Sequence, residues 1–304
     1  MNKAISVTVI GAGLMGHGIG QVFARAGHAV VITDTNEEIL GQAMGRIEKN
    51  LLDEGVDPLR VLCNVSVESN LAKAVQYADL VIEAAPERLE LKQKLFADIA
   101  KAAPSHAVLA SNTSVIPITK IGEHMEPSVR SRLVGTHWWN PPHLVPLVEV
   151  VRTEFTSLSV FEQTYAWLEA VGKRPVKVHQ DVTGFIGNRL QHAMWREAIG
   201  LIEDGVCDGE AIDLVVKNSF GMRLPVLGPI ENADLVGLEL TRDVHRVMFP
   251  DLKTNRFPSA LLDRLIDEGH TGMKAGAGLR VWTKSEVEAV HTELAAHLLR
   301  MTSR

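Results

Sequence analysis

The stretch Ile5-Ser-Val-Thr-Val-Ile-Gly11-Ala-Gly13-Leu-Met-Gly16 decides the expected fold. Residues 5–10 alternate apolar and β-branched side chains, which predicts a strand. The glycines that follow satisfy the pattern G-x-G-x-x-G, and an apolar helical pattern continues to Ala26. A strand, a glycine turn and a helix in this order indicate a dinucleotide site, because the turn lets pyrophosphate approach the backbone at a helix N-terminus.

The acidic residue that ends the next strand narrows the choice of dinucleotide. Ala29–Thr33 predicts that strand, and Asp34 follows it. The spacing from the glycines is close to that of a carboxylate that accepts hydrogen bonds from the adenosine ribose. Such a carboxylate would repel the 2′-phosphate of NADP, and no Arg or Lys follows immediately to offset it. NAD is the predicted cofactor; a plain strand–turn–helix in which Asp34 caps a helix is the alternative.

The bulk composition excludes several classes of protein. A chain of 304 residues suits about two domains. Its net charge of −6, with scattered Lys and Arg, argues against nucleic acid or an anionic membrane as a partner. No apolar run approaches the ~18–20 residues that cross a bilayer, Met1–Ile10 lacks a signal-peptide pattern, and Cys63 and Cys207 are too few for a disulfide framework. We expect a cytoplasmic protein that acts on a small molecule.

The order of elements predicts the architecture. Further strands are expected at Ala78–Glu83, Ala107–Ser111, Leu133–His137 and Leu147–Val151, with helices at Glu37–Leu52 and Leu89–Ala103. This alternation predicts an α/β fold with a doubly wound, parallel, Rossmann-type sheet. Helical patterns then dominate, at Gly184–Asp204, Asp208–Asn218, Pro229–Met248 and Pro258–Glu268. With Val176–Val182 as the junction, the predicted domains are an NAD-binding domain, 1–181, and an all-α domain, 182–304, to which the family resemblance described below assigns substrate binding and dimerisation.

His137 is the strongest candidate for a general base. It ends an apolar strand at the carboxyl edge of the predicted sheet, where ligands bind, and the prolines of Trp138-Trp139-Asn140-Pro141-Pro142 then force an extended turn. Glu149 lies on the next short strand and can return beside it. A neutral imidazole can take a hydroxyl proton while a carboxylate fixes its tautomer. By spacing alone, a core histidine with an unrelated surface carboxylate is equally well supported.

Two other polar positions have open interpretations. Ser111-Asn112-Thr113-Ser114 follows another strand at the same edge, so its hydroxyls either bind substrate or cap the next segment. Asn188 lies inside a predicted helix, an unfavourable place for an amide unless it faces a polar cleft. His137 and His143 lack a third convincing ligand, so no metal site is predicted.

Taken in order, these motifs resemble the 3-hydroxyacyl-CoA dehydrogenase family nearly from end to end. The shared motifs are Gly11–Gly16, Ile82-Glu83-Ala84 with Glu87 and Lys92, Ser111–Ser114, His137 with Asn140-Pro141 and Glu149, Gly184-Phe185-Ile186 with Asn188-Arg189, and Gly228-Pro229. The resemblance implies NAD-dependent oxidation of an L-3-hydroxy group to a 3-keto group, a role in fatty acid metabolism, and a homodimer joined through the helical domain.

The resemblance also assigns roles to individual residues. It implies that His137 is the base and Glu149 its orienting partner, and that Ser114, Asn140 and Asn188 bind the hydroxyl and carbonyl region of the substrate. The implied cofactor-binding residues are Gly11, Gly13, Leu14, Met15, Gly16, Asp34, Glu87, Lys92, Asn140 and Lys274. Leu201, Ile202 and Val206 are candidates for the dimer interface, although a buried core within one chain would show the same pattern.

The departures from the family concern the substrate. Trp138 and Trp139 replace two phenylalanines, and either indole is a candidate for stacking on substrate. Gly41–Leu62 offers only Arg46, Lys49 and Arg60, whereas acyl-CoA members are Lys-rich near the helix that meets the CoA nucleotide. Gly221-Met222-Arg223 is similar to members that act on small free acids, such as gulonate or carnitine dehydrogenases.

The substrate therefore stays open between a CoA thioester and a free hydroxy acid. Arg223 can hold a carboxylate through a bidentate pair, or can form an ion pair between helices. A non-catalytic, NAD-binding structural protein, as some relatives are in eye lenses, is the remote alternative.

Overall fold

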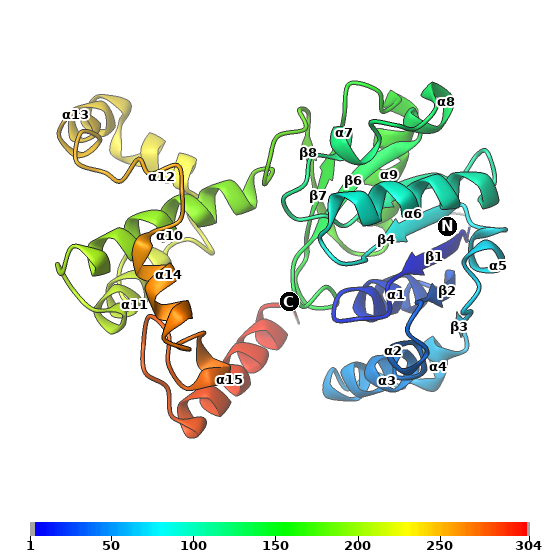
Figure 1. Cartoon of the computed structure of the whole chain (residues 1–304), viewed down its shortest axis with the longest axis horizontal. Coiled ribbons are helices and arrows are strands. Elements are labelled where there is room, and N and C mark those ends of the chain that lie inside the picture. Colours follow the sequence, from blue (N-terminus) through cyan, green and yellow to red (C-terminus); the bar gives the residue numbers. More distant parts are fainter. Residues whose placement is uncertain (1–3, 303–304) are drawn as a thin grey trace. The chain divides into compact units, whose positions relative to one another are not determined.

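One eight-stranded sheet forms the centre of the first part of the chain (Figure 1). The computed structural model describes residues 4–302. The strand order is β3-β2-β1-β4-β5-β6-β7-β8, in which β1 to β6 run parallel, β7 is antiparallel to β6, and β8 is parallel to β7. The strands are β1 (Ser6–Ile10), β2 (Ala29–Thr33), β3 (Val65–Val67), β4 (Leu80–Glu83), β5 (Val108–Ser111), β6 (Leu133–Trp138), β7 (Leu147–Val151) and β8 (Arg174–Val178). The predicted α/β class is confirmed, and the sheet is parallel except at the β6–β7 pair.

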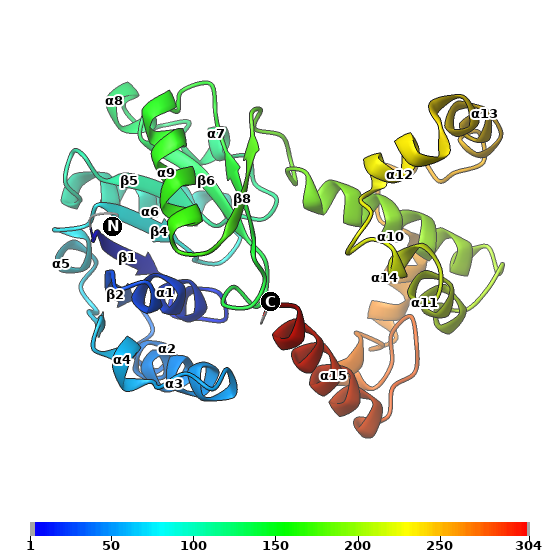
Figure 2. The same ribbon diagram turned by 180° about the vertical axis from the view of Figure 1, so that it is seen from behind.

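Helices cover both faces of this sheet. One hydrophobic cluster joins it to α1, α3 and α9, and the other joins it to α5, α6 and α7. Figure 1 shows α6 across one face, and Figure 2 shows α9 on the opposite face. The helices of this part are α1 (Gly16–Arg25), α2 (Glu37–Gly41), α3 (Ala43–Asp53), α4 (Leu59–Leu62), α5 (Leu71–Val75), α6 (Leu89–Ala102), α7 (Ile118–Ile121), α8 (Pro127–Arg130) and α9 (Leu158–Ala170).

The central strands are apolar on both sides because helices cover both faces of the sheet. In β1, Val7 and Val9 belong to the cluster with α1, whereas Ile10 belongs to the cluster with α6. Thr8 faces the second layer, and its hydroxyl donates to the carbonyl oxygen of Ala74 at 2.7 Å. A strand covered on both faces buries nearly every side chain, so its sequence is apolar throughout.

The structure corrects several sequence-based boundaries. The predicted helix Glu37–Leu52 is divided at Gln42 into α2 and α3. The predicted junction Val176–Val182 begins inside β8, an edge strand whose Pro175 and alternating exposed residues gave no clear strand signal. Such a pattern is tolerated at an edge, where one row of backbone groups has no partner strand.

Residues 190–295 form a second compact unit, which is helical. Its elements include α10 (Gly187–Glu203), α11 (Gly209–Lys217), η1 (Phe220–Met222), α12 (Pro229–Val236), α13 (Leu238–Met248), α14 (Ala260–Asp267), η2 (Met273–Ala275) and most of α15 (Lys284–Thr302). The predicted helix Pro229–Met248 is broken at Gly237, which has φ +93°. This second compact unit begins at Leu190. The predicted domain boundary between residues 181 and 182 stays a prediction. In residues 4–302, no helix is both long and apolar enough to cross a membrane.

Candidate active site

The glycine turn lies at the carboxyl ends of the neighbouring strands β1 and β4. The strand order reverses between these two neighbours, and ligands of open α/β sheets bind at such a point. Gly11 leaves β1 there with φ +98°, and a Cβ on it would lie 2.6 Å from the carbonyl oxygen of Ala84. The glycine is therefore needed both for the backbone conformation and for close contact with the neighbouring chain.

Position 13 is a glycine for a different reason, which concerns the cofactor. A Cβ built on Gly13 meets no protein atom within 4 Å. Packing within the protein therefore does not require a glycine at this position. A glycine is required if a ligand approaches the backbone closely here. Helix α1 begins at Gly16, so the N–H groups of its first turn have no partner within the helix. The open space beside Gly13 and these N–H groups fit the pyrophosphate of NAD.

Asp34 fixes this turn from the end of β2. Its Oδ2 accepts a hydrogen bond from the backbone N–H of Ala12 at 2.8 Å, and its Oδ1 accepts one from Asn36 at 2.9 Å. Arg46 also reaches the turn, with Nη1 3.5 Å from the carbonyl oxygen of Ala12. A basic side chain thus lies near the predicted ribose site. The sequence immediately after Asp34, which contains no Arg or Lys, did not predict this neighbour.

A buried charge cluster lies at the end of β4. The ammonium of Lys92 is 2.6 Å from Glu83 Oε1 and 3.4 Å from Glu87 Oε2, and the Lys92 side chain is fully buried. Ser111 donates to the other oxygen of Glu83 at 2.6 Å. The ammonium is enclosed by protein carboxylates, and the predicted roles of Lys92 and Glu87 along the cofactor stay predictions.

Glu87 shapes the turn that carries Ser114. Its Oε1 accepts hydrogen bonds from the hydroxyl of Thr113 and from the backbone N–H groups of Ser114 and Val115, both at 3.0 Å. Burial would raise the pKa of Glu87, but these hydrogen bonds and the charge of Lys92 outweigh it and lower the pKa below its ordinary value. The ionised carboxylate holds the turn in place.

His137 and Glu149 form a buried pair at the same edge of the sheet. They occupy directly opposed positions in the antiparallel ladder of β6 and β7. His137 Nδ1 is 2.7 Å from Glu149 Oε2, and the two residues are 3% and 1% exposed. With Nδ1–H donating to the carboxylate, Nε2 is left as an acceptor. The interpretation of His137 as a core histidine with an unrelated carboxylate is therefore wrong.

The other oxygen of Glu149 binds the start of α10. Oε1 accepts hydrogen bonds from the backbone N–H groups of Ile186 at 2.8 Å and Gly187 at 3.0 Å. The next residue, Asn188, donates from Nδ2 to the carbonyl oxygen of Ser114 at 2.8 Å. The structure therefore brings together His137, Glu149, Ser114 and Asn188, although their roles stay predictions. No pattern in the sequence signalled the backbone contacts of Glu149.

The two tryptophans face in different directions. Trp138 is 2% exposed and packs against Phe23 in the core beneath α1. The prediction that Trp138 binds substrate is wrong, because neighbouring residues of a strand point to opposite faces and His137 takes the other one. The Trp139 ring lies 5.3 Å from that of His137, and its substrate role stays a prediction. Asn140, whose peptide bond to Pro141 is cis, follows it and is exposed; its role also stays a prediction.

Another histidine pair lies outside this group. His17 Nδ1 is 2.6 Å from the carbonyl oxygen of Gly13, and His143 Nδ1 is 3.5 Å from Asn50 Nδ2. Burial, followed by the charges of His17 and Lys173, lowers the pKa of His143 to about 4. Within residues 4–302, no three His, Cys, Asp or Glu residues are grouped so that they could hold a metal ion.

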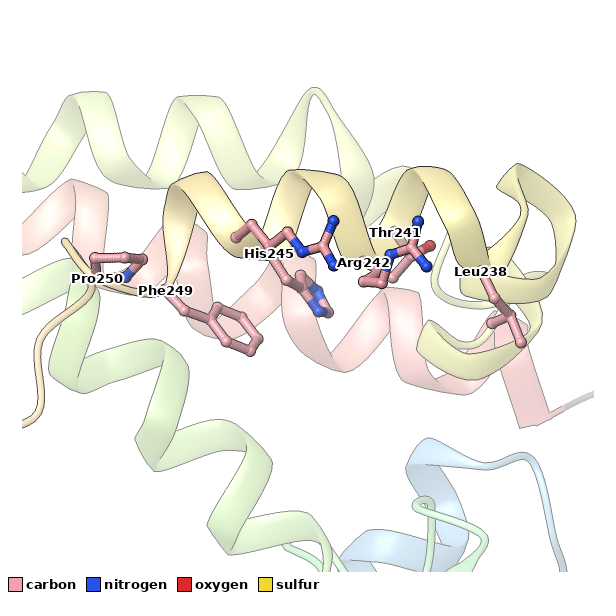
Figure 3. A pocket seen from close by; sticks show the side chains of 7 residues that line it. Leu238, Thr241, Arg242, His245, Phe249 and Pro250 are labelled. Carbon is pink, nitrogen blue, oxygen red and sulfur yellow. The ribbon is translucent and has the colours of Figure 1, made fainter.

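The remaining predicted residues belong to the helical unit. Arg223 follows η1 and is exposed, and Lys274 lies in η2. A shallow hollow of about 680 Å³ on α13, lined by Leu238, His245 and Phe249 among others, contains none of the predicted site residues (Figure 3). The roles of Arg223 and Lys274 stay predictions.

The fold and this group of residues define an NAD-dependent dehydrogenase. The family model "3-hydroxyacyl-CoA dehydrogenase, NAD binding domain" matches residues 6–182, and the model of the C-terminal domain matches residues 184–282. The chain belongs to the 3-hydroxyacyl-CoA dehydrogenase family, whose members act on a CH–OH group. The predicted family, enzyme class and NAD cofactor are confirmed.

Its relatives include enzymes with different substrates. The chain is 33% identical to 5-formyl-3-hydroxy-2-methylpyridine 4-carboxylate 5-dehydrogenase of Mesorhizobium japonicum, over 97% of this chain and 96% of that one. It is 37% identical to the mitochondrial hydroxyacyl-coenzyme A dehydrogenase of Homo sapiens, over 90% and 89%.

The solved structures show the same division. A crystal structure of the pyridine carboxylate dehydrogenase, described as an NAD⁺-dependent dismutase, has a TM-score of 0.90 at 31% identity, with 98% and 97% of the two chains covered. The (S)-3-hydroxybutyryl-CoA dehydrogenase of Ralstonia eutropha has a TM-score of 0.74 at 28% identity, with 93% and 100% covered.

Proposed function

We propose that the protein oxidises the hydroxyl group of a small free hydroxy acid to the corresponding carbonyl, with the pair of His137 and Glu149 as its proton acceptor. The observation that carries the chemistry is the 2.7 Å contact between His137 Nδ1 and Glu149 Oε2. It leaves Nε2 free to remove the hydroxyl proton, while the carboxylate stabilises the imidazolium that forms. NAD, when bound, supplies the acceptor for the hydride.

The neighbouring groups support binding of the substrate's oxygen atoms. The side-chain amide of Asn188 donates a hydrogen bond to the backbone carbonyl of Ser114 at 2.8 Å. The Ser114 hydroxyl and the side-chain oxygen of Asn188 take no part in this bond. Both groups can bind the hydroxyl or carbonyl of the substrate beside the imidazole. In the reverse direction, the protonated His137 would polarise that carbonyl.

Two observations favour a free acid over a CoA thioester. The substrate in the name of the Mesorhizobium relative carries a free carboxylate. In addition, the few basic side chains of residues 41–62 are engaged within the protein. Lys49 pairs with Asp53 at 2.9 Å, Arg60 with Asp57 at 3.5 Å, and Arg46 donates to Gln42 at 2.6 Å. Two of the three cations of this segment thus have a carboxylate partner, and Arg46 hydrogen-bonds to the neutral groups of Gln42 and Ala12, which leaves little free positive charge for a CoA nucleotide.

Arg223 is the candidate for binding the substrate carboxylate. It is exposed, and the described part of the chain offers its guanidinium no hydrogen bond or ion pair. The alternative, an ion pair between helices, therefore has no support. A guanidinium matches a carboxylate with two parallel hydrogen bonds, which a lysine cannot reproduce.

A substrate panel tests this proposal. The protein is assayed with NAD against free 3-hydroxy acids, including aromatic and cyclic ones, and against 3-hydroxybutyryl-CoA. We expect kcat/KM to be highest for a free acid. Arg223→Met should raise KM for that acid by about 10- to 100-fold, since a charged hydrogen bond is lost, whereas Arg256→Met, at another exposed arginine of the helical unit, should not. A preference for the thioester would contradict the substrate assignment, and absence of turnover with every compound would contradict the reaction.

We further propose that two copies of the chain associate through the helical unit. Leu261, which is 7% exposed, is the one large apolar side chain that is buried among the described residues of this unit, whereas Leu238, Val247 and Phe249 of the α13 region are 65%, 75% and 56% exposed. Figure 3 shows Leu238 and Phe249 along the hollow on α13. Exposed apolar surface of this extent is typical of an interface.

Light scattering tests the proposed dimer. Val247→Asp should weaken the dimer, whereas Tyr77→Asp, on the other unit, should not. A wild-type monomer at micromolar concentration would contradict the proposal.

The protein is also proposed to be cytoplasmic. Both of its cysteines, exposed Cys63 and half-buried Cys207, are free thiols, which suits a reducing compartment.

A further inference from the structure

We propose that Glu149 has a second role, in which its carboxylate positions the segment that carries Asn188 as well as the imidazole of His137. This inference rests on the proposed function, because it concerns the same reaction centre. Oε2 is 2.7 Å from His137 Nδ1, and Oε1 accepts from Ile186 N at 2.8 Å and from Gly187 N at 3.0 Å. Each oxygen of one carboxylate thus serves a different segment of the chain.

The segment bound by Oε1 adopts a conformation that needs support from its surroundings. Gly184 has φ +74°, and Phe185 has φ +49°, which is uncommon for a residue with a side chain. Strained backbone of this kind persists when neighbouring structure holds it. The Phe185 ring is 1% exposed and lies 5.6 Å from that of His137, and the carboxylate binds the two N–H groups that follow. Packing and hydrogen bonds together fix the turn.

These N–H groups also suit a carboxylate. They lie at the first residues of α10, where N–H groups have no acceptor within the helix and the helix dipole favours a negative charge. Burial would raise the pKa of Glu149, but the hydrogen bonds from His137, Gly187 and Ile186 outweigh it and lower the pKa below its ordinary value. The start of α10 therefore helps Glu149 to stay ionised, as a partner of an imidazolium must.

The consequence for the reaction centre is geometric. Asn188 follows Gly187 directly, and a Cβ at Gly187 would lie 2.4 Å from Trp139 Cζ2, so the backbone here has little room to move towards that ring. A shift of the two N–H groups would carry the Asn188 amide away from Ser114. Glu149 contacts neither substrate nor cofactor in this assignment; it is a positioning residue that sets the separation between His137 and Asn188.

Two substitutions at one position separate the two roles. In Glu149→Gln, the amide oxygen can still accept from Ile186 and Gly187, but the NH₂ group faces His137 Nδ1 and forces the imidazole proton onto Nε2. Glu149→Ala removes both interactions. We expect kcat to fall by about 10³- to 10⁴-fold in both variants, as loss of the correct tautomer does elsewhere. Only the Ala variant should also show faster hydrogen exchange at the Ile186 and Gly187 amides and a KM raised about tenfold.

Val150→Ala is the matched control, because Val150 is the next residue of β7 and is buried on the opposite face of the sheet. It should leave the exchange at both amides unchanged. In an Asn188→Ala background, the KM difference between the Gln and Ala variants should disappear, since no amide remains to be displaced.

Equal exchange rates and equal KM values in Glu149→Gln and Glu149→Ala would overturn the proposal and leave Glu149 with the imidazole alone. Exchange is measured without substrate, so a wrong substrate assignment would affect the KM comparison and leave the exchange comparison valid. If the Ala variant does not fold, Glu149→Asp replaces it. Its shorter side chain cannot reach both partners, so it should lose either the amide protection or the wild-type pH dependence of kcat. Retention of both would equally overturn the proposal.

Discussion

The carboxylate of Glu149 lies 2.7 Å from Nδ1 of His137 because the two residues are opposed in the antiparallel ladder of β6 and β7. Directly opposed residues of such a pair project their side chains to the same face at close range. The change of strand direction at β7 thus places a carboxylate beside the imidazole at the carboxyl edge of β6. The pair is a product of the sheet topology.

Replacement of His137 by Gln should remove the proton acceptor without disturbing NAD binding. We expect kcat to fall by about 10³-fold, within the usual contribution of general acid–base catalysis. The Kd for NADH, from fluorescence titration, should stay within about twofold of wild type, because His137 contributes nothing to the glycine turn in the proposed site. Full activity of the variant with the true substrate would contradict the mechanism.

Replacement of Gly13 by Ala should separate cofactor binding from folding. A Cβ at Gly13 meets no protein atom within 4 Å, so we expect the free energy of unfolding to change by less than about 1 kcal/mol. The methyl group would occupy the proposed path of the pyrophosphate, so NAD affinity should fall at least about tenfold, which corresponds to about 1.4 kcal/mol.

Gly16→Ala provides the contrasting result at the same turn. A Cβ on Gly16 would lie 1.6 Å from the carbonyl oxygen of Gly11, so this variant should be strongly destabilised in thermal unfolding. If Gly13→Ala binds NAD as tightly as wild type, the pyrophosphate does not pass beside Gly13.

Replacement of Lys92 by Met should destabilise the protein by about 3–5 kcal/mol, because it leaves the buried carboxylate of Glu83 without its cation. The measurement is the midpoint of urea unfolding. The double variant with Glu83→Gln should recover part of the loss, since no buried charge is then unpaired. Lys101→Met is the control, because its pair with Asp98 is exposed and should be worth less than about 1 kcal/mol. An equal effect of the two lysine substitutions would refute the assignment of Lys92 to a buried pair.

His143 should make the protein sensitive to mild acid. Its pKa is lowered to about 4 by burial and by the neighbouring His17 and Lys173, whereas the unfolded chain has the ordinary value near 6.5. Between these values the unfolded state binds the proton and the folded state does not, so stability is lost as the pH falls from 6.5 towards 4. The loss should reach about 2 kcal/mol at pH 5.

The test compares unfolding of wild type and His143→Gln at pH 7.5 and pH 5. The difference between the two proteins at pH 7.5 records the lost packing and the lost contact with Asn50, and the change in that difference at pH 5 records the titration. An unchanged difference would show that His143 is not the group responsible.

Much of the site could be predicted from local sequence signals. Gly11, Gly13 and Asp34 lie where a strand–turn–helix motif needs them, and the structure places Asp34 on the Ala12 N–H of that same turn. These relationships depend on residues close together in the chain, whose geometry is set by backbone conformation. The helix at Glu37–Leu52 was less well predicted, because it is interrupted at Gln42, directly after Gly41, and a single Gly inside a helical pattern does not by itself fix the end of a helix.

The sequence by itself determined the dinucleotide site, the class of fold and His137 as the candidate base, since these follow from short motifs and from alternation along single strands. Only the tertiary structure decided that Glu149 meets His137, that its second oxygen holds Ile186 and Gly187, and that Trp138 is buried against Phe23. The physical reason is that cross-strand register and strand direction are properties of pairs of distant segments. A pattern along one segment records which of its side chains share a face, but it does not record which partner that face will meet.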